Sequence, residues 1–262
     1  MTTPSTNLQL RRISVEFDVP ISRIVLRHAP LNVIDIAMME ELTESLAEIE
    51  AHPEVSVIVL SGQGKAFSVG VDVAAHTPDK VEEMLTKFHA VIRALVATQK
   101  VTIAVVQGYC LGGGAELAMM CDIVHTTESA QWGFPEIKLG CYPPVAATAL
   151  AALVGQKRAA ELILTGRTIP GKEAAEIRLA NRAVSETDLA AALEESISCL
   201  REFSPVALAL AKKASYAWDS MHFDKGLARA ERIYFDELMK TSDAHEGVRA
   251  FMEKRAPNWT GK

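Results

Sequence analysis

The chain has 262 residues, of which 49% are hydrophobic and 23% are charged, a balance typical of folded globular proteins. Its formal net charge is −6 and no Lys/Arg-rich run follows the pair Arg11 and Arg12, so nucleic acid is not an expected partner. No stretch reaches the roughly 18 apolar residues of a membrane span, and the first twelve residues lack the apolar segment of a secretory signal. We therefore expect a cytoplasmic protein with no membrane association.

The N-terminal part predicts a hairpin, a helix and a buried strand. Residues 13–17 alternate apolar and polar side chains, a proline turn follows, and residues 23–27 form the second strand of the pair. Residues 55–60 form a continuous apolar run that ends at a glycine-containing turn, as buried strands do. Between them, apolar residues at helical spacing follow a possible cap at Asp35; they are Met39, Leu42, Leu46 and Ile49.

The middle of the chain repeats the order of strand, turn and helix. A helix is expected to start at Thr77 and Pro78 and to end near residue 100. A buried strand at 101–108 leads into a glycine-initiated helix at 111–120, and a further strand follows at 122–127. Three such repeats predict an α/β fold of stacked units, although periodicity leaves the order of strands in the sheet open.

After Pro144 the sequence is almost entirely helix-like. We expect a strand-bearing core over residues 1–200 and a helical region over residues 201–262. The predicted helical segments are 145–154, 157–164, 172–179, 186–202 and 205 to the end of the chain.

Familiar cofactor, metal and nucleophile motifs are incomplete. At Gly62 and Gly64 the third glycine of a dinucleotide-binding loop would fall at Phe67, and a P-loop would need glycine at Val59. No G-x-S-x-G elbow exists. The seven histidines and four cysteines show no metal-ligand spacing, so we expect no metal site and free thiols at Cys110, Cys121, Cys141 and Cys199.

Two glutamates stand beside backbone suited to close approach. The run Gly112 to Gly114 opens a helix, where it could hold an oxyanion or simply let helix and strand pack closely. Glu116 lies one turn further among apolar residues, either as a buried functional carboxylate or as a dipole partner on an exposed face. Glu136 follows the aromatic segment 132–135, which would limit solvent and raise its pKa. Together they suggest a general acid and base pair.

At these positions the sequence resembles the crotonase, or enoyl-CoA hydratase, superfamily. The matching blocks are KAFSVGVDV (65–73), GYCLGGGAELAMMCDIV (108–124) and GFPEIKLG (133–140), and segments 164–184 and 245–255 resemble later landmarks of the family. The resemblance implies a spiral of repeated ββα units followed by a C-terminal helical trimerisation region, assembled as a trimer or a dimer of trimers. The substrate would be an acyl-CoA thioester, whose CoA is part of the substrate, with no separate cofactor.

The same resemblance implies roles for individual residues. The backbone N–H groups of Val71 and Gly113 would hold the thioester oxygen and stabilise developing negative charge. Hydratases of the family carry both glutamates found here, Glu116 and Glu136, which makes hydration the leading hypothesis. Position 74, often a lysine that meets the CoA phosphates, is alanine in this chain. The implied substrate and CoA positions are Val33, Ser68, Val69, Asp72, Met84, Phe88, Trp132, Phe134, Tyr142, Phe235, Phe251 and Lys254.

The expected acyl-pocket walls suggest the substrate. Segments 68–73, 76–85 and 141–147 are most similar to cyclohexa-1,5-diene-1-carbonyl-CoA hydratases of anaerobic benzoyl-CoA degradation, whose product is 6-hydroxycyclohex-1-ene-1-carbonyl-CoA. Bulky apolar residues would suit a flat ring, although Met84 and Phe88 also fit an ordinary helix core. The alternatives are a general short-chain enoyl-CoA hydratase, or another enzyme of the fold such as a ring hydrolase or isomerase. A non-enzymatic relative would not need two costly buried carboxylates.

Overall fold

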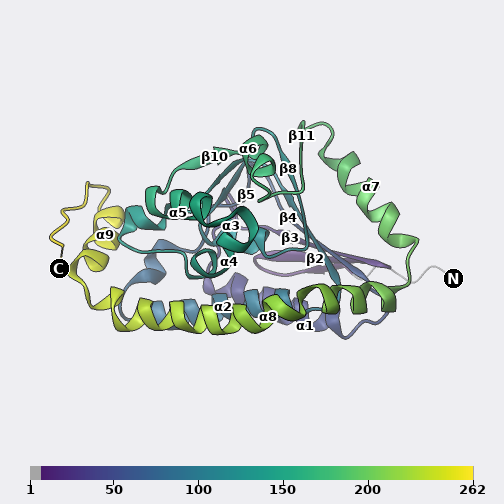
Figure 1. The fold of residues 1–262 in the computed structure, drawn as a ribbon, viewed down its shortest axis with the longest axis horizontal. Coiled ribbons are helices and arrows are strands. Elements are labelled where there is room, and N and C mark those ends of the chain that lie inside the picture. Colours follow the sequence, from purple (N-terminus) through teal and green to yellow (C-terminus); the bar gives the residue numbers. More distant parts are fainter. Residues whose placement is uncertain (1–6, 262) are drawn as a thin grey trace.

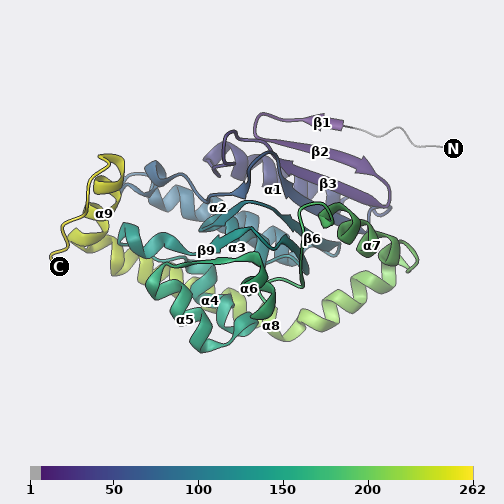
Figure 2. The same ribbon diagram turned by 90° about the horizontal axis from the view of Figure 1, so that it is seen from above.

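The structure, a computed structural model, describes the backbone of residues 7–261 and the side chains of residues 10–216 and 222–261. Its larger sheet has the order β1-β2-β3-β4-β6-β8-β11. The first three strands pair antiparallel and the others pair parallel (Figures 1 and 2). These strands are β1 (Asn7–Gln9), β2 (Ile13–Asp18), β3 (Ile21–Leu26), β4 (Val57–Gly62), β6 (Val101–Val106), β8 (Ile123–Thr127) and β11 (Arg182–Val184).

A second, smaller sheet lies inside the molecule and was not expected from the sequence. It has the order β10-β9-β7-β5, in which β5, β7 and β9 are parallel and β10 is antiparallel. Its strands, each three residues long, are β5 (Ala66–Ser68), β7 (Tyr109–Leu111), β9 (Gln131–Gly133) and β10 (Thr168–Pro170). Runs this short have no usable periodicity, so the sequence predicted only the longer strands of the larger sheet: β2, β3, β4, β6 and β8.

Each turn of the chain adds one strand to each sheet and then a helix. The first turn comprises β4, β5 and α2 (Val81–Ala97), and the second comprises β6, β7 and α3 (Gly113–Met119). The third comprises β8, β9, the short 3₁₀ helix η2 (Pro135–Leu139) and α4 (Pro144–Val154). The predicted α/β spiral of repeated ββα units is therefore confirmed.

Helix starts follow local backbone chemistry. Helix α1 (Ile36–Glu50) begins where expected, because the Asp35 carboxylate accepts a hydrogen bond from the Met38 N–H at 2.9 Å. Helix α2 begins at Val81, later than predicted. Thr77 is extended, with ψ 152°, as the residue before a proline prefers. A separate 3₁₀ helix, η1 (Val73–His76), occupies the preceding turn.

The remaining helices form the C-terminal half and pack back onto the spiral. The 32-residue helix α8 (Pro205–Asp236) runs along α2 and α4 (Figure 1). It is fixed to α2 at Glu231, whose Oε1 lies 2.7 Å from Nδ1 of His89 and 2.9 Å from Nη2 of Arg93. The others are α5 (Gln156–Thr165), α6 (Gly171–Glu176), α7 (Leu189–Arg201), η3 (Leu238–Lys240) and α9 (Ser242–Met252).

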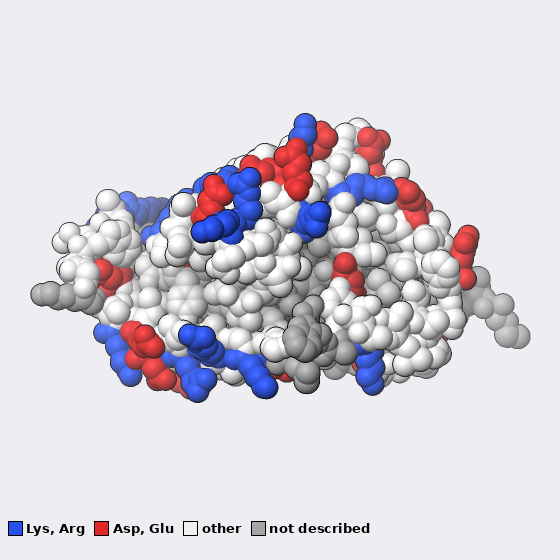
Figure 3. Space-filling model, viewed as in Figure 1, with Lys and Arg blue, Asp and Glu red and all other residues white. Residues whose placement is uncertain are grey.

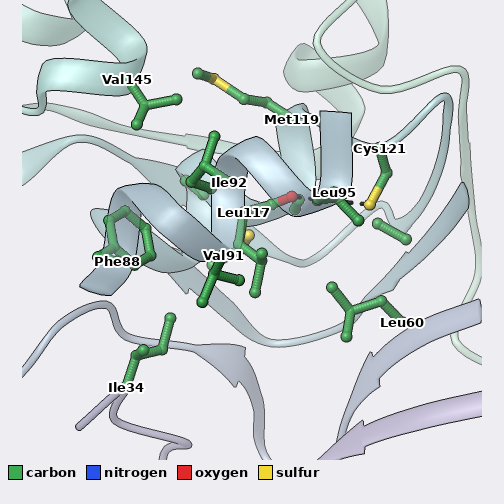
Figure 4. Packing of buried hydrophobic residues seen from close by; sticks show 14 of the residues in the cluster. Ile34, Leu60, Phe88, Val91, Ile92, Leu95, Leu117, Met119, Cys121 and Val145 are labelled. Atoms are coloured by element: carbon green, nitrogen blue, oxygen red, sulfur yellow. Dashed lines mark hydrogen bonds between the residues drawn. The ribbon is translucent and has the colours of Figure 1, made fainter. Parts of the chain in front are cut away.

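The main hydrophobic core lies between the larger sheet and its helices. Figure 4 shows Phe88, Ile92 and Leu95 of α2 packed near Leu117 of α3, and all four side chains are buried. The opposite face of the sheet is covered by α7, which buries Leu189 and Ile197 against a separate apolar cluster; its strand members are Ile21, Val57, Val59, Val101, Ile103 and Val105. Both faces are thus covered, which explains the continuous apolar runs of β4 and β6. Over residues 7–261, no helix is sufficiently long and apolar to span a bilayer.

We predict that Asp35→Ala lowers the free energy of unfolding by about 1 kcal/mol or more, because α1 loses its capping acceptor. Asp35 also accepts a hydrogen bond from the Arg12 Nε at 2.6 Å, which adds to the loss. The matched control is Asp188→Ala: Asp188 precedes α7 in the same way but accepts no capping hydrogen bond. Chemical denaturation of both variants measures the difference, and an equal loss in the two would contradict the capping role.

Candidate active site

A cavity of about 630 Å³ lies where the glycine-initiated helix α3 meets η2 and the C-terminal helices. Most of its lining is apolar, and it includes both glutamates singled out from the sequence, Glu116 and Glu136. The other predicted site residues that line it are Val33, Val69, Val71, Asp72, Met84, Phe88, Gly113, Tyr142 and Phe251. The spiral thus brings together residues from segments far apart in the chain.

Two backbone N–H groups meet at one wall of the cavity. Val71 lies between two backbone hydrogen bonds to Ile34, from the Ile34 N–H to the Gly70 oxygen at 2.9 Å and from the Asp72 N–H to the Ile34 oxygen at 3.1 Å. Gly113 is the first residue of α3, where helix N–H groups have no partner within the helix. Neither the Val71 nor the Gly113 N–H donates to any group among the described residues. Both donors are therefore available to an oxygen atom in the cavity.

Glycine is required at the turn that brings these segments together. Gly70 has φ +99°, and a Cβ there would lie 2.9 Å from the Leu111 oxygen and 3.2 Å from the Gly113 nitrogen. Gly112 has φ +53°, and a Cβ there would lie 2.6 Å from Oε1 of Glu136. A larger residue at either position would push the two walls apart, so the glycines serve close approach.

Glu116 is buried on α3 and faces the start of α4. Its side chain is 3% exposed, which rules out the alternative of a partly exposed dipole partner. One carboxyl oxygen accepts a hydrogen bond from the Ala146 N–H at 2.9 Å. Burial raises the pKa of Glu116 to about 7, because desolvation disfavours the charged form more than this hydrogen bond favours it.

Glu136 is the second residue of η2, on the opposite side of the glycine turn, and is half-buried. Burial, followed by the negative charge of Glu116, raises the pKa of Glu136 well above its ordinary value. Its Oε2 atom is buried and has no hydrogen-bond partner among the described residues. Both pKa values are raised, so near neutral pH the pair tends to hold one proton between the two carboxyl groups.

Two aromatic residues that we expected to line the acyl pocket belong to the core instead. Trp132 and Phe134 are fully buried and pack within the main hydrophobic cluster. The Trp132 indole donates to Oγ1 of Thr126 at 3.0 Å, which satisfies its one polar group. Trp132 is the middle residue of β9, an inner strand of the small sheet, and Phe134 follows that strand, so these alternate residues turn their side chains to the same face. That part of the prediction was wrong, whereas Tyr142 does line the cavity.

Three further predicted contact residues lie outside the cavity lining. Ser68 is buried beneath the Gly70 turn, donates to the Asn32 oxygen at 2.7 Å and accepts from the Gly70 N–H at 3.1 Å. It therefore positions the turn. Phe235 packs edge-on against Tyr234, with ring centroids 6.1 Å apart, and Lys254 is exposed just after α9.

The cavity also contains residues that sequence reasoning missed. Tyr234 of α8 contributes a buried phenol, and three basic side chains line the cavity as well: His76, Lys138 and Arg255. No local motif marks any of them, because they enter the site from four different elements or loops. Arg255 is paired with Glu246 and Glu253, and burial lowers the pKa of His76.

The fold and paired carboxyl groups define an acyl-CoA enzyme of the crotonase type, and comparison with known proteins agrees. The family model for enoyl-CoA hydratase/isomerase matches residues 16–262. The chain belongs to that family.

Individual relatives cover nearly the whole chain. A probable enoyl-CoA hydratase of Mycobacterium bovis is 36% identical over 95% of this chain and 97% of its own length. Cyclohexa-1,5-dienecarbonyl-CoA hydratase of Thauera aromatica is 32% identical over 96% of this chain and 97% of its own. A solved enoyl-CoA hydratase from Mycobacterium avium subsp. paratuberculosis superimposes with a TM-score of 0.87 at 26% identity, covering 96% of this chain and 100% of that one.

We predict that Glu116→Gln stabilises the protein at pH 8 but has little effect at pH 4.5. The folded protein keeps a proton up to a pKa of about 7, whereas the unfolded chain loses it near the ordinary value of about 4.3. Stability is therefore lost as the pH rises between these two values, by an amount on the order of 3 kcal/mol. Glutamine avoids this loss because it does not ionise.

Thermal unfolding at the two pH values measures this effect. The matched control is Glu48→Gln, on the exposed side of α1, which should change the unfolding temperature little at either pH. A gain for Glu116→Gln that is equal at pH 4.5 and pH 8 would contradict the buried-ionisation argument.

Proposed function

We propose that the protein is an acyl-CoA hydratase, which adds water across a double bond conjugated to a thioester. The observation that carries the proposal is the pair of buried carboxyl groups, Glu116 and Glu136, facing the same cavity as the free N–H groups of Val71 and Gly113. Hydration needs a base for water, an acid for carbon and donors for the charge on the thioester oxygen. The four groups supply these three functions.

The two glutamates would divide the roles of base and acid. Glu116 accepts the Ala146 N–H, a contact that favours its carboxylate form, and it would take a proton from the attacking water. Glu136, whose pKa is raised further by the charge of Glu116, would give its proton to the substrate carbon. The negative charge passing through the thioester would rest on the oxygen held by Val71 and Gly113. This mechanism assigns no step to a metal or redox cofactor.

For the acyl group, we favour a cyclic diene over a flexible chain. The walls near the carboxyl groups include Val69, Met84, Phe88 and Tyr142. A flat ring buries apolar area there at about 25 cal/mol per Å² and has few internal rotations to lose on binding. The relative from Thauera aromatica is named for such a substrate. The substrate would be cyclohexa-1,5-diene-1-carbonyl-CoA, with a role in anaerobic benzoyl-CoA degradation.

A general short-chain enoyl-CoA hydratase is the second candidate. It is favoured by the name of the Mycobacterium bovis relative, which is 36% identical to this chain. The same catalytic groups would serve both substrates, so the difference lies in how the walls fit the acyl group.

The CoA part would lie toward the C-terminal helices. Phe251 of α9 lines the cavity beside Arg255, while the predicted contacts Phe235 and Lys254 are outside the cavity of this single chain.

A trimer or dimer of trimers could bring further residues to the mouth of the cavity. On the face seen in Figure 3, charged side chains gather along the edges and leave an uncharged band over α4, where Leu153 is exposed. Such a surface supports the proposed homo-oligomer.

We predict that Glu116→Gln and Glu136→Gln each lower kcat by about a hundredfold or more, because each loses one proton-transfer group. The thioester donors remain, so KM for the acyl-CoA should change much less. The matched control, Glu48→Gln, should retain wild-type turnover. Activity within a few-fold of the wild type in either cavity variant would remove that glutamate from the mechanism.

We also predict that hydration of cyclohexa-1,5-diene-1-carbonyl-CoA proceeds with a higher kcat/KM than hydration of crotonyl-CoA. Following the loss of the substrate chromophore and identifying the products by mass spectrometry gives both values. A higher kcat/KM for crotonyl-CoA would overturn the ring preference and leave the hydratase assignment in place.

A further inference from the structure

Tyr234 places an unpaired phenol in the candidate active site. It lies on α8, is 1% exposed and contributes to the lining of the cavity that holds Glu116 and Glu136. Its hydroxyl has no hydrogen-bond partner among the described residues. A buried hydroxyl without a partner is costly, so a chain normally pairs it or replaces it with phenylalanine.

The neighbouring residue Tyr142 has a hydrogen-bond partner for its hydroxyl, so this part of the protein can pair a buried phenol. The Tyr142 ring packs edge-on against Tyr234, with centroids 5.2 Å apart, and its hydroxyl donates to the Ala230 oxygen at 2.5 Å. The thiol of Cys141 lies beside the Tyr234 hydroxyl, and this contact influences the pKa of both groups, but its geometry is too poor for a hydrogen bond. The thiol donates instead to the Leu139 oxygen at 3.6 Å. Sulfur is also a weak acceptor. The Tyr234 hydroxyl is thus the unsatisfied member of an otherwise paired cluster.

We propose that the Tyr234 hydroxyl positions the attacking water and then holds the hydroxyl group formed from it. This proposal rests on the hydratase function proposed above. The thioester oxygen has its own donors at Val71 and Gly113. Beyond the thioester, the enoyl or dienyl group contains no polar atom that could pair with a hydroxyl. The water oxygen, which becomes the product hydroxyl, is therefore the ligand atom left to pair with this phenol.

The arrangement is chemically balanced. Water gives one proton to the Glu116 carboxylate and accepts a hydrogen bond from Tyr234 through one lone pair. Its other lone pair forms the new C–O bond. The π electrons move to the thioester oxygen, then return as Glu136 gives its proton to carbon. Transfer of a proton from Glu116 to Glu136 restores the pair. Tyr234 keeps its own proton throughout, consistent with burial raising the pKa of its phenol well above the ordinary value.

This role differs in its consequences from a structural one. Removing a hydroxyl that has no partner in the protein should not weaken the fold and can stabilise it. Removing a hydroxyl that orders the nucleophile should lower kcat while leaving KM for the unsaturated substrate nearly unchanged, because that substrate has no hydroxyl yet. The variant Tyr234→Phe keeps the ring and its packing, and therefore separates the two roles.

Kinetics and thermal unfolding of Tyr234→Phe provide the first test. We expect kcat for the preferred enoyl-CoA to fall about tenfold, KM to stay within about twofold, and the unfolding temperature to stay equal or rise. Tyr109→Phe removes an exposed hydroxyl and is the control for the substitution itself. Cys141→Ala removes the neighbouring thiol. An unchanged kcat in Tyr234→Phe overturns the proposal, as does a Cys141→Ala variant that reproduces the same loss.

A binding experiment tests the hydroxyl contact without turnover. In the Glu116→Gln background, calorimetry compares 3-hydroxybutyryl-CoA with butyryl-CoA, which differ by one hydroxyl group. We expect the preference for the hydroxy ligand to fall about fivefold or more when Tyr234→Phe is added. An unchanged preference overturns the proposal. If the wild type hydrates no enoyl-CoA, the hydratase assignment fails separately, and the binding comparison still decides whether Tyr234 binds a hydroxyl.

Discussion

Burial of two carboxyl groups in one apolar cavity is the constraint on which the site depends. Glu116 accepts a backbone hydrogen bond from Ala146, and the backbone of Val145 also lowers its pKa, while the Oε2 atom of Glu136 receives no hydrogen bond. Neither an arginine nor a lysine is paired with them among the described side chains, so desolvation and mutual repulsion dominate and both pKa values rise. This loss of stability leaves one proton on the pair near neutral pH, which is the state that the proposed acid and base catalysis requires.

The spiral fold brings the parts of the site together. Successive turns place β5 and β7 side by side in the small sheet, so the segments that follow them, at Gly70 and Gly112, meet without a side chain between them. Asn32 fixes the first turn through its side-chain amide, which donates to the oxygens of Gln63, Ala66 and Phe67. Two free N–H groups and the carboxyl groups of both glutamates are then brought together from separate turns of the spiral. Local structure alone could not place them at one site.

The sequence predicted those parts of the structure whose signals are local and long. Apolar runs such as 101–106 and the glycine block before Glu116 indicated buried strands and a close-approach site. The three-residue strands of the small sheet gave no periodicity, so the second sheet was missed. The sequence pattern of an aromatic residue beside the Glu136 loop is the same whether its side chain faces a cavity or the core. Trp132 was therefore predicted to line the pocket although it packs in the core. The position of Tyr234 at the cavity depends on how the 32-residue helix α8 is rotated and where it packs. The residues next to Tyr234 in the sequence do not contain this information.

The C-terminal helices therefore form part of the cavity wall, while the spiral positions Glu116, Glu136 and the two backbone donors. Helix α8 is fixed on one side by the contacts of Glu231 with α2 and on the other by the Tyr142 hydroxyl at Ala230, one turn before Tyr234. These contacts hold α8 in place and so keep Tyr234 at the cavity wall. A change in this helix would adjust how the proposed site holds the acyl group and water, and it would leave the glycine turns and both glutamates in place.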